Sequence, residues 1–135
     1  VEFGQDMPAT EFVGYDYDAI DDAKVLAKSV IRSSLVKAAM FGADANWGRI
    51  LCALGYAGVE MDPDKVDVSF RSCEGSIPVC VNGRGIPFDE DIAKKILTQK
   101  TIYIDVNMNS GAEYATAWGC DLTYEYVRIN GDYRS

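Results

Sequence analysis

The sequence predicts an α+β fold, with one mostly antiparallel or mixed sheet and about three helices packed on one face of it. Amphipathic helical spacing is found in the first half of the chain and in a short segment near residue 90, whereas alternating, strand-like segments dominate residues 66–129. No internal repeat, low-complexity linker or shift in composition divides the 135 residues. We therefore expect a single domain over residues 1–135.

The clearest helical pattern follows a short expected strand at residues 11–15. Asp21 and Asp22 are typical of a helix N-terminus, because they can cap free N–H groups and complement the helix dipole. The apolar residues that follow fall at i, i+3, i+4, i+7 and i+8 and form one stripe: Ala23, Leu26, Ala27, Val30 and Ile31. This stripe predicts a helix with one buried face.

A second helix is expected after residue 46. The serines at 33–34 interrupt the first helix, and the short apolar segment 35–41 is compatible with either a buried strand or a helix. The turn at residues 42–46 offers Asp44 or Asn46 as a helix cap. Beyond it, one helical face is apolar: Trp47, Ile50, Leu51 and Leu54.

The second half of the chain predicts strands. Residues 66–70 alternate cleanly, and residues 77–81 lead into Asn82-Gly83, a pair typical of a two-residue hairpin turn. The acidic run 89–91 suits the start of a third, short helix, which carries three apolar residues: Ile92, Ile96 and Leu97. Residues 101–108 alternate again, and residues 114–129 form a final long strand region.

Charge and composition exclude several classes of function. A net charge of −8 argues against nucleic-acid binding, which depends on clustered Lys and Arg. No segment approaches the roughly 20 apolar residues of a membrane helix, so we expect no membrane partner and a cytoplasmic location. Histidine is absent, which excludes Ser-His-Asp and Cys-His catalysis within this chain alone. The cysteines match no Cys-x-x-Cys pattern and are expected to be buried, reduced thiols.

Two kinds of polar cluster could carry chemistry, and each also has a structural explanation. The segment 42–50 could offer backbone N–H groups and Arg49 to an anion, but a capped helix with a Trp anchor is the commoner use of such residues. The acidic clusters 62–64 and 89–91 lie beside turn or helix-start signals and lack the spacing of a calcium loop, so no metal is expected. The hydroxyls of Ser110, Thr116, Thr123 and Ser135 have no histidine to activate them.

Three segments together resemble the bifunctional glutamate/ornithine N-acetyltransferases of the cyclic arginine pathway. They are the helix at residues 22–28, the segment 34–50 with its Asn-Trp-Gly-Arg string, and residues 115–135 with their closing Asn-Gly-Asp-Tyr-Arg-Ser. Their order and spacing agree with this family over nearly the whole chain. The resemblance implies that residues 1–135 correspond to the C-terminal part of the family's β chain.

The resemblance also implies a reaction. Members of this family cut themselves into an α and a β chain, and the new N-terminal Thr of the β chain carries acetyl from N-acetylornithine to glutamate. The free α-amine of a terminal Thr can act as its base, so no histidine is needed. The α chain supplies the oxyanion hole. Because this sequence begins at Val1, we expect no catalytic residue within it and no activity from it alone.

The expected partners follow from the same resemblance. They are the α chain and the remainder of the β chain, in a hetero-oligomer of α and β chains, with N-acetylornithine and glutamate as substrates. No cofactor is expected, although acetyl-CoA could serve as an alternative acetyl donor.

Four positions are expected to meet substrate. In the family, an Asn near the chain end and the terminal hydroxyl contact the ornithine moiety, and they correspond to Asn130 and Ser135. Met7 stands where the family has a Glu that pairs with the substrate's amino group, and losing that carboxylate costs about 1.5–3 kcal/mol of binding. Asp6 is a possible substitute. The alternatives are a non-catalytic small-molecule-binding or interaction domain that lost this Glu, and another acyltransferase or amidase with an N-terminal nucleophile.

Overall fold

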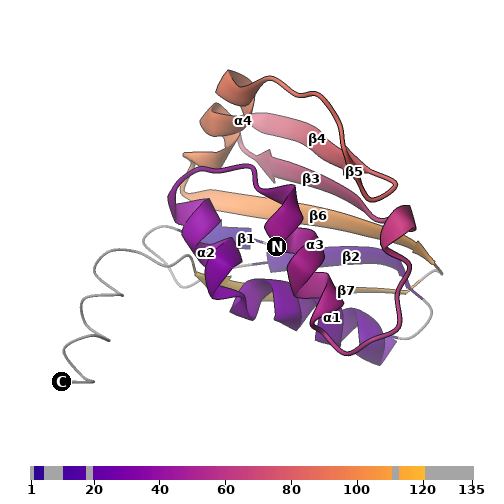
Figure 1. Ribbon diagram of the computed structural model, residues 1–135. Coiled ribbons are helices and arrows are strands. Elements are labelled where there is room, and N and C mark those ends of the chain that lie inside the picture. Colours follow the sequence, from indigo (N-terminus) through magenta and orange to yellow (C-terminus); the bar gives the residue numbers. More distant parts are fainter. Residues whose placement is uncertain (1, 5–10, 18–19, 111–112, 121–135) are drawn as a thin grey trace.

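The structure is a computed structural model that describes residues 2–4, 11–17, 20–110 and 113–120 (Figure 1). It has the expected α+β fold. The described helices are α1 (Ile20–Arg32), α2 (Ser34–Phe41), α3 (Trp47–Gly55) and α4 (Glu90–Leu97), with a 3-10 turn, η1 (Pro63–Lys65). The described strands are β1 (Glu2–Gly4), β2 (Glu11–Tyr17), β3 (Asp67–Ser72), β4 (Gly75–Val81), β5 (Arg84–Gly85), β6 (Thr101–Ser110) and β7 (Glu113–Cys120).

These strands form one mixed sheet in the order β1-β7-β2-β6-β3-β4-β5, with β1 also paired to β6. The β1–β7 and β2–β6 pairs are parallel, and the other pairs are antiparallel. Strands β1 and β2 share one position between β6 and β7, because Glu2 and Glu11 both pair with Tyr103. Two short strands at the start of the chain therefore separate β6 from β7, which follow one another in sequence.

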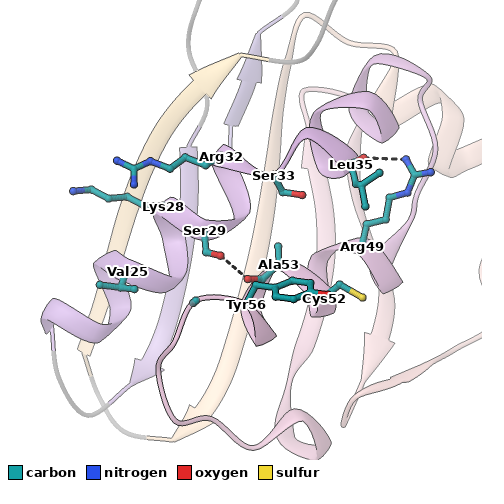
Figure 2. A pocket seen from close by; sticks show the side chains of 11 residues that line it. Val25, Lys28, Ser29, Arg32, Ser33, Leu35, Arg49, Cys52, Ala53 and Tyr56 are labelled. Carbon is teal, nitrogen blue, oxygen red and sulfur yellow. Dashed lines mark hydrogen bonds between the residues drawn. The ribbon is translucent and has the colours of Figure 1, made fainter.

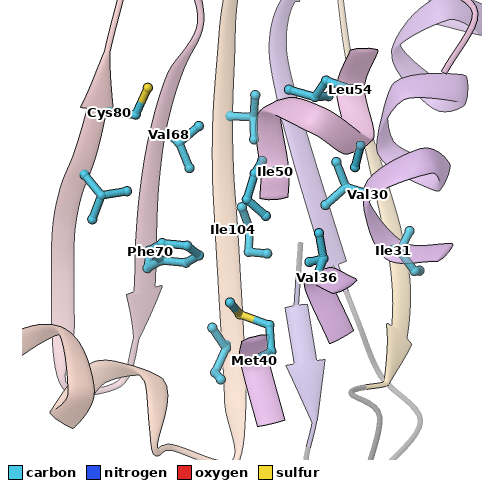
Figure 3. Packing of buried hydrophobic residues seen from close by; sticks show 14 of the residues in the cluster. Val30, Ile31, Val36, Met40, Ile50, Leu54, Val68, Phe70, Cys80 and Ile104 are labelled. Carbon is cyan, nitrogen blue, oxygen red and sulfur yellow. The ribbon is translucent and has the colours of Figure 1, made fainter. Parts of the chain in front are cut away.

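The helices cover one face of the sheet. Helix α1 packs on β7 and β2, and α4 packs on β3 and β4 (Figure 1). On β6, every second residue is buried under this layer: Ile102, Ile104, Val106 and Met108. Phe70 on β3 pairs with Ile104 and is also fully buried, and Figure 3 shows both within the hydrophobic core. The opposite face of β6 and β3 carries half-buried polar residues.

Helix α1 confirms the predicted stripe, since the five residues of that stripe are all buried. The ambiguous segment 35–41 is helical, which adds a fourth helix to the three expected. Ser33 caps α2 by accepting the Val36 N–H at 3.3 Å, and Val36, Ala39 and Met40 are buried at helical spacing. The third expected helix is α4, in which Ala93, Ile96 and Leu97 are buried and Ile92 is 51% exposed.

The Asn82-Gly83 hairpin is also confirmed. Both residues have positive φ, 52° and 73°, as the two central positions of this turn type require. The Asn82 N–H donates to Asp67 Oδ1 at 2.9 Å, which ties the turn to β3. A side chain at Gly83 would overlap the Pro63 carbonyl, so this position needs glycine for space as well as for φ.

Two further expectations concern helices and cysteines. In the part of the chain that the structure describes, no helix is long and apolar enough to cross a membrane. The expectation of buried thiols is wrong for Cys52 and Cys73, which are exposed, and right for Cys80; all three are free. Burial, followed by the negative charge of Asp67, raises the pKa of the Cys80 thiol above its ordinary value. The Cys120 side chain lies outside the described residues.

Candidate functional site

The four expected substrate-binding residues, Asp6, Met7, Asn130 and Ser135, lie outside the described residues. The residues that flank their segments are described, and they fall at one end of the sheet. Gly4, which precedes segment 5–10, pairs with Thr101 and with Cys120, the last described residue before segment 121–135.

Glu11, which follows segment 5–10, pairs with Tyr103, two residues further along β6. In Figure 1 this end of the sheet lies at the left, where β6 begins and β7 ends. Both expected substrate-binding segments therefore join the described chain at the same end of the sheet, and we take this end as the candidate site.

A cavity of about 500 Å³ lies at this end of the sheet. The start of β6, the end of β3 and the loop before β6 supply its lining: Arg71, Ser72, Cys73, Gln99, Lys100, Thr101 and Tyr103. The Cys73 thiol contacts Gln99 Oε1 at 3.5 Å across the loop. The lining therefore offers cationic, amide, hydroxyl and thiol groups within reach of one small polar molecule.

Arg71 is the most constrained side chain of this cavity. Its Nε donates to Asp105 Oδ2 at 2.8 Å and its Nη2 to Asp105 Oδ1 at 3.2 Å, a two-point contact. The guanidinium also stacks on the Tyr103 ring, 4.1 Å from the ring centre. A guanidinium group that makes two hydrogen bonds to one carboxylate and stacks on an aromatic ring is held in one orientation. Arg71 thus presents a fixed cation in the cavity wall, on the face of the sheet opposite the helices.

The Asn-Trp-Gly-Arg segment has the structural role that we considered the commoner one. Asn46 Oδ1 accepts the Arg49 N–H at 3.2 Å and caps α3. The Trp47 indole packs against the backbone of Gly85. The Arg49 Nη1 donates to the Leu35 carbonyl at 2.9 Å and joins α3 to α2. In this structure the segment anchors the helix layer and leaves no arginine poised for an anion.

The acidic clusters also act as caps. Asp62 accepts the Asp64 N–H at 3.0 Å at the start of η1. Asp89 accepts the N–H groups of Asp91 at 2.9 Å and of Ile92 at 3.2 Å at the start of α4. Among the residues with described positions, no three His, Cys, Asp or Glu side chains gather as a metal site.

Two of the four hydroxyl candidates, Ser110 and Thr116, lie among the described residues. Ser110 Oγ donates to the Met108 carbonyl at 3.2 Å, and Thr116 is half-buried on β7. Thr123 and Ser135 lie outside the described residues.

A second cavity, of about 590 Å³, opens on the outer side of the helix layer between α1, α2 and α3 (Figure 2). Ser29 Oγ donates to the Ala53 carbonyl on its floor. Lys28, Arg32 and Arg49 all line it, but Figure 2 shows that Lys28 and Arg32 extend to one side of α1 while Arg49 lies on the far side, next to Leu35. The three cations therefore do not form one cluster in this cavity.

Sequence reasoning missed the Arg71–Asp105 pair because 34 residues separate the two side chains. A usable signal was present. Residues 66–70 and 101–108 both alternate, and an antiparallel pairing of their apolar faces brings the polar faces together as well. The register pairs Arg71 with Tyr103 and Ser69 with Asp105.

Comparisons with known proteins agree with this fold and with the sequence motifs. The chain is 62% identical over 114 residues to the arginine biosynthesis bifunctional protein ArgJ 1 of Clostridium acetobutylicum, a match that covers 84% of this chain and 28% of that protein. It is 49% identical over 114 residues to the glutamate N-acetyltransferase of Methanopyrus kandleri, covering 84% of this chain and 29% of the relative. The chain thus spans less than a third of the length of these curated relatives.

A solved structure and a family model agree with these relatives. The crystal structure of the arginine biosynthesis bifunctional protein argJ from Bacillus halodurans matches with a TM-score of 0.85 and 38% identity. That match covers 94% of this chain and 58% of the crystallised one. The model of the ArgJ family matches residues 15–135. This chain belongs to the ArgJ family, and it matches part of the length of arginine-biosynthesis acetyltransferases.

Proposed function

We propose that this chain is the C-terminal, substrate-binding and assembly portion of an acetyltransferase that moves acetyl from N-acetylornithine to glutamate. The family match and the names of the relatives support an arginine-biosynthesis acetyltransferase. The observation that carries the substrate-binding role is the convergence of Gly4, Glu11 and Cys120 at one end of the sheet. Segments 5–10 and 121–135, which hold the expected substrate contacts, both leave the described chain there.

The proposed reaction runs through an N-terminal Thr that lies outside this chain and is released by autocatalytic cleavage. The Thr hydroxyl attacks the acetyl carbonyl of N-acetylornithine, its proton passes through the α-amine base, and ornithine leaves as the free amine. The glutamate amine then attacks the acyl-enzyme, N-acetylglutamate forms, and the Thr hydroxyl is restored. Asn130 and Ser135 hold the ornithine moiety during the first half of this cycle. No cofactor is needed, and acetyl-CoA is a possible second acetyl donor.

The sheet face without helices is the proposed contact surface for the α chain and the remainder of the β chain. Within the described part of the chain, this face carries half-buried polar side chains and no covering helix. Tyr103, Asp105 and Asn107 on β6 and Arg71 on β3 contribute to it. The remaining two-thirds or more of each relative's length is available to cover such a face.

The direct test uses the full-length gene product that contains this chain. Incubation with N-acetylornithine labelled in the acetyl group and unlabelled glutamate should yield labelled N-acetylglutamate and free ornithine. Deleting residues 132–135 should raise the KM for N-acetylornithine or abolish turnover. Absence of exchange by the intact protein would reject the proposed reaction, and unchanged kinetics of the deletion would reject a substrate-binding role for the chain end.

The second candidate function is a non-catalytic binding or interaction domain. The observation that favours it is Met7, because a thioether cannot replace the carboxylate that the family resemblance places there. The same assay separates the two functions. A non-catalytic domain would bind ligand or partner without transferring the label.

A further inference from the structure

Among the described strands, β7 forms an open edge of the sheet. Its pairings within the described ranges are with β1 and β2, which share one position, and each of these two strands also pairs with β6. The other side of β7 therefore meets no strand among the described elements. An exposed strand edge presents unpaired N–H and C=O groups, and native proteins cover, shorten or charge such edges because other strands add to them.

A cavity of about 340 Å³ lies between this edge and α1. We call its lining the β7 edge surface, and it comprises Lys28, Ile31, Arg32, Thr116, Ala117 and Trp118. Trp118 is 61% exposed, and Tyr114 on the same strand is 60% exposed. Large exposed aromatic side chains beside an open edge are typical of protein interfaces rather than of solvated surface.

The charge of this surface is opposite to that of the chain. Lys28 and Arg32 are one helical turn apart on α1, and Figure 2 shows their side chains extending together on the side away from Arg49. Like charges at this spacing destabilise a helix slightly. Neither cation pairs with any acid whose side chain is described, although the chain has 21 acidic residues and a net charge of −8. The pair is thus placed to receive a carboxylate from outside these elements.

We propose that the β7 edge surface docks an extended, carboxylate-bearing segment from the remainder of the full-length gene product, which adds to β7 as a further strand. This inference rests on the proposed function, in which the chain is one portion of a longer acetyltransferase. The backbone groups of β7 supply the strand pairing, Lys28 and Arg32 receive an Asp or Glu of the incoming segment, and Trp118 packs on its apolar residues. The relatives are more than three times as long as the match, so the occupant need not be a separate protein.

The test places a photoreactive residue at the edge of the full-length protein, as Trp118→p-benzoylphenylalanine, followed by irradiation and mass spectrometry. The expected product is a cross-link to one segment outside residues 1–135 that contains Asp or Glu. Adding Arg32→Glu should lower the yield about tenfold, because like charges then face each other across the contact. The matched control is Lys24→Glu, an exposed cation of the same helix outside the cavity lining, and it should leave the yield within about twofold.

Four results would overturn the proposal: no cross-link beyond residues 1–135, a cross-link confined to residues 121–135, a cross-link to a second copy, or a yield indifferent to Arg32→Glu. Arg32→Gln provides a milder variant, with a smaller loss expected, if the charge reversal prevents folding. Acetyl exchange by the unmodified protein is measured in parallel. A cross-link without acetyl exchange would reject the proposed acetyltransferase activity and support the docking surface. Acetyl exchange without a cross-link would support the activity and reject the docking surface.

Discussion

The Trp47 indole lies directly against the backbone of Gly85, so that a side chain at residue 85 would overlap the ring. Trp47 is the first residue of α3, and Gly85 ends the short strand β5. This contact joins the helix layer to the far edge of the sheet from β7. It explains why an aromatic residue at the start of α3 and a glycine 38 positions later belong to the same structural unit.

Replacing Gly85 should therefore destabilise the protein. Gly85→Ala forces a methyl group into the space of the indole, and overpacking of this kind costs about 1–3 kcal/mol. Urea unfolding followed by tryptophan fluorescence measures the change. Gly55→Ala is the control, because a side chain at residue 55 meets nothing within 4 Å, and as a helical Gly→Ala change it should leave the midpoint equal or slightly raised. Equal midpoints for the two variants would mean that Trp47 moves freely away from β5.

Removing the cap of α3 should also lower the stability of the protein, by a smaller amount than Gly85→Ala. Asn46→Ala deletes the oxygen that accepts the Arg49 N–H, and loss of an N-cap costs about 1 kcal/mol. Asn46→Ser keeps a capping oxygen and should recover most of that stability. Thermal unfolding of the two variants checks this ranking. If both lose the same stability, Asn46 contributes through something other than its cap.

The cysteines should differ in reactivity. Cys52 and Cys73 are exposed and should be alkylated by iodoacetamide in the folded protein, whereas Cys80 is fully buried and should react only after unfolding. Peptide mapping of the alkylated protein gives the result for each thiol. Rapid labelling of Cys80 under native conditions would contradict its place in the core.

The same thiol should make stability depend on pH. Because burial raises the folded pKa of Cys80, the unfolded chain loses this proton first as pH rises above the ordinary thiol value of about 8.5. The contribution of Cys80 is therefore intact below that pH and falls above it. As pH rises above the ordinary thiol pKa, the free energy of unfolding should decline more steeply in the wild type than in Cys80→Ala. Parallel curves would show that the thiol proton is not linked to folding.

Local patterns were sufficient to predict α1, α3 and the Asn82-Gly83 turn, because the residues that indicate each of these elements lie close together in the sequence. The segment 35–41 was ambiguous because a run this short, apolar at every position except Lys37, fits either structure. The segment is helical because Ser33 caps it and because one helical face packs against the core.

Local sequence patterns could not predict which distant segments pair with one another in the sheet. Nothing in the three residues of β1 indicates that β1 and β2 lie between β6 and β7, since that arrangement depends on register across the whole sheet. The Arg71–Asp105 contact was missed for the same reason. Asp6, Met7, Asn130 and Ser135 remain predictions, because their segments lie outside the described residues.

If Asp6 supplies the carboxylate that Met7 cannot, the two positions should respond differently to substitution. In the full-length protein, Asp6→Asn should weaken N-acetylornithine binding by about tenfold, the value of one charge-assisted contact, because the substrate's amino group loses its partner. Met7→Leu should change binding little, since it exchanges one apolar side chain for another. Steady-state KM and isothermal titration give the ranking, and the opposite ranking would remove Asp6 from the site.

The most direct test of a substrate-binding role for this portion is the acetyl exchange rate of full-length Asn130→Ala, with Asn109→Ala as its control. Asn109 is exposed at the opposite end of β6 from Thr101, where its amide donates to the Lys65 carbonyl at 2.7 Å. Asn130→Ala should lower kcat/KM for N-acetylornithine by about tenfold or more, because a substrate hydrogen bond is lost, while Asn109→Ala should stay within about twofold of wild type. Equal kcat/KM values for Asn130→Ala and the wild type would remove Asn130 from the substrate site.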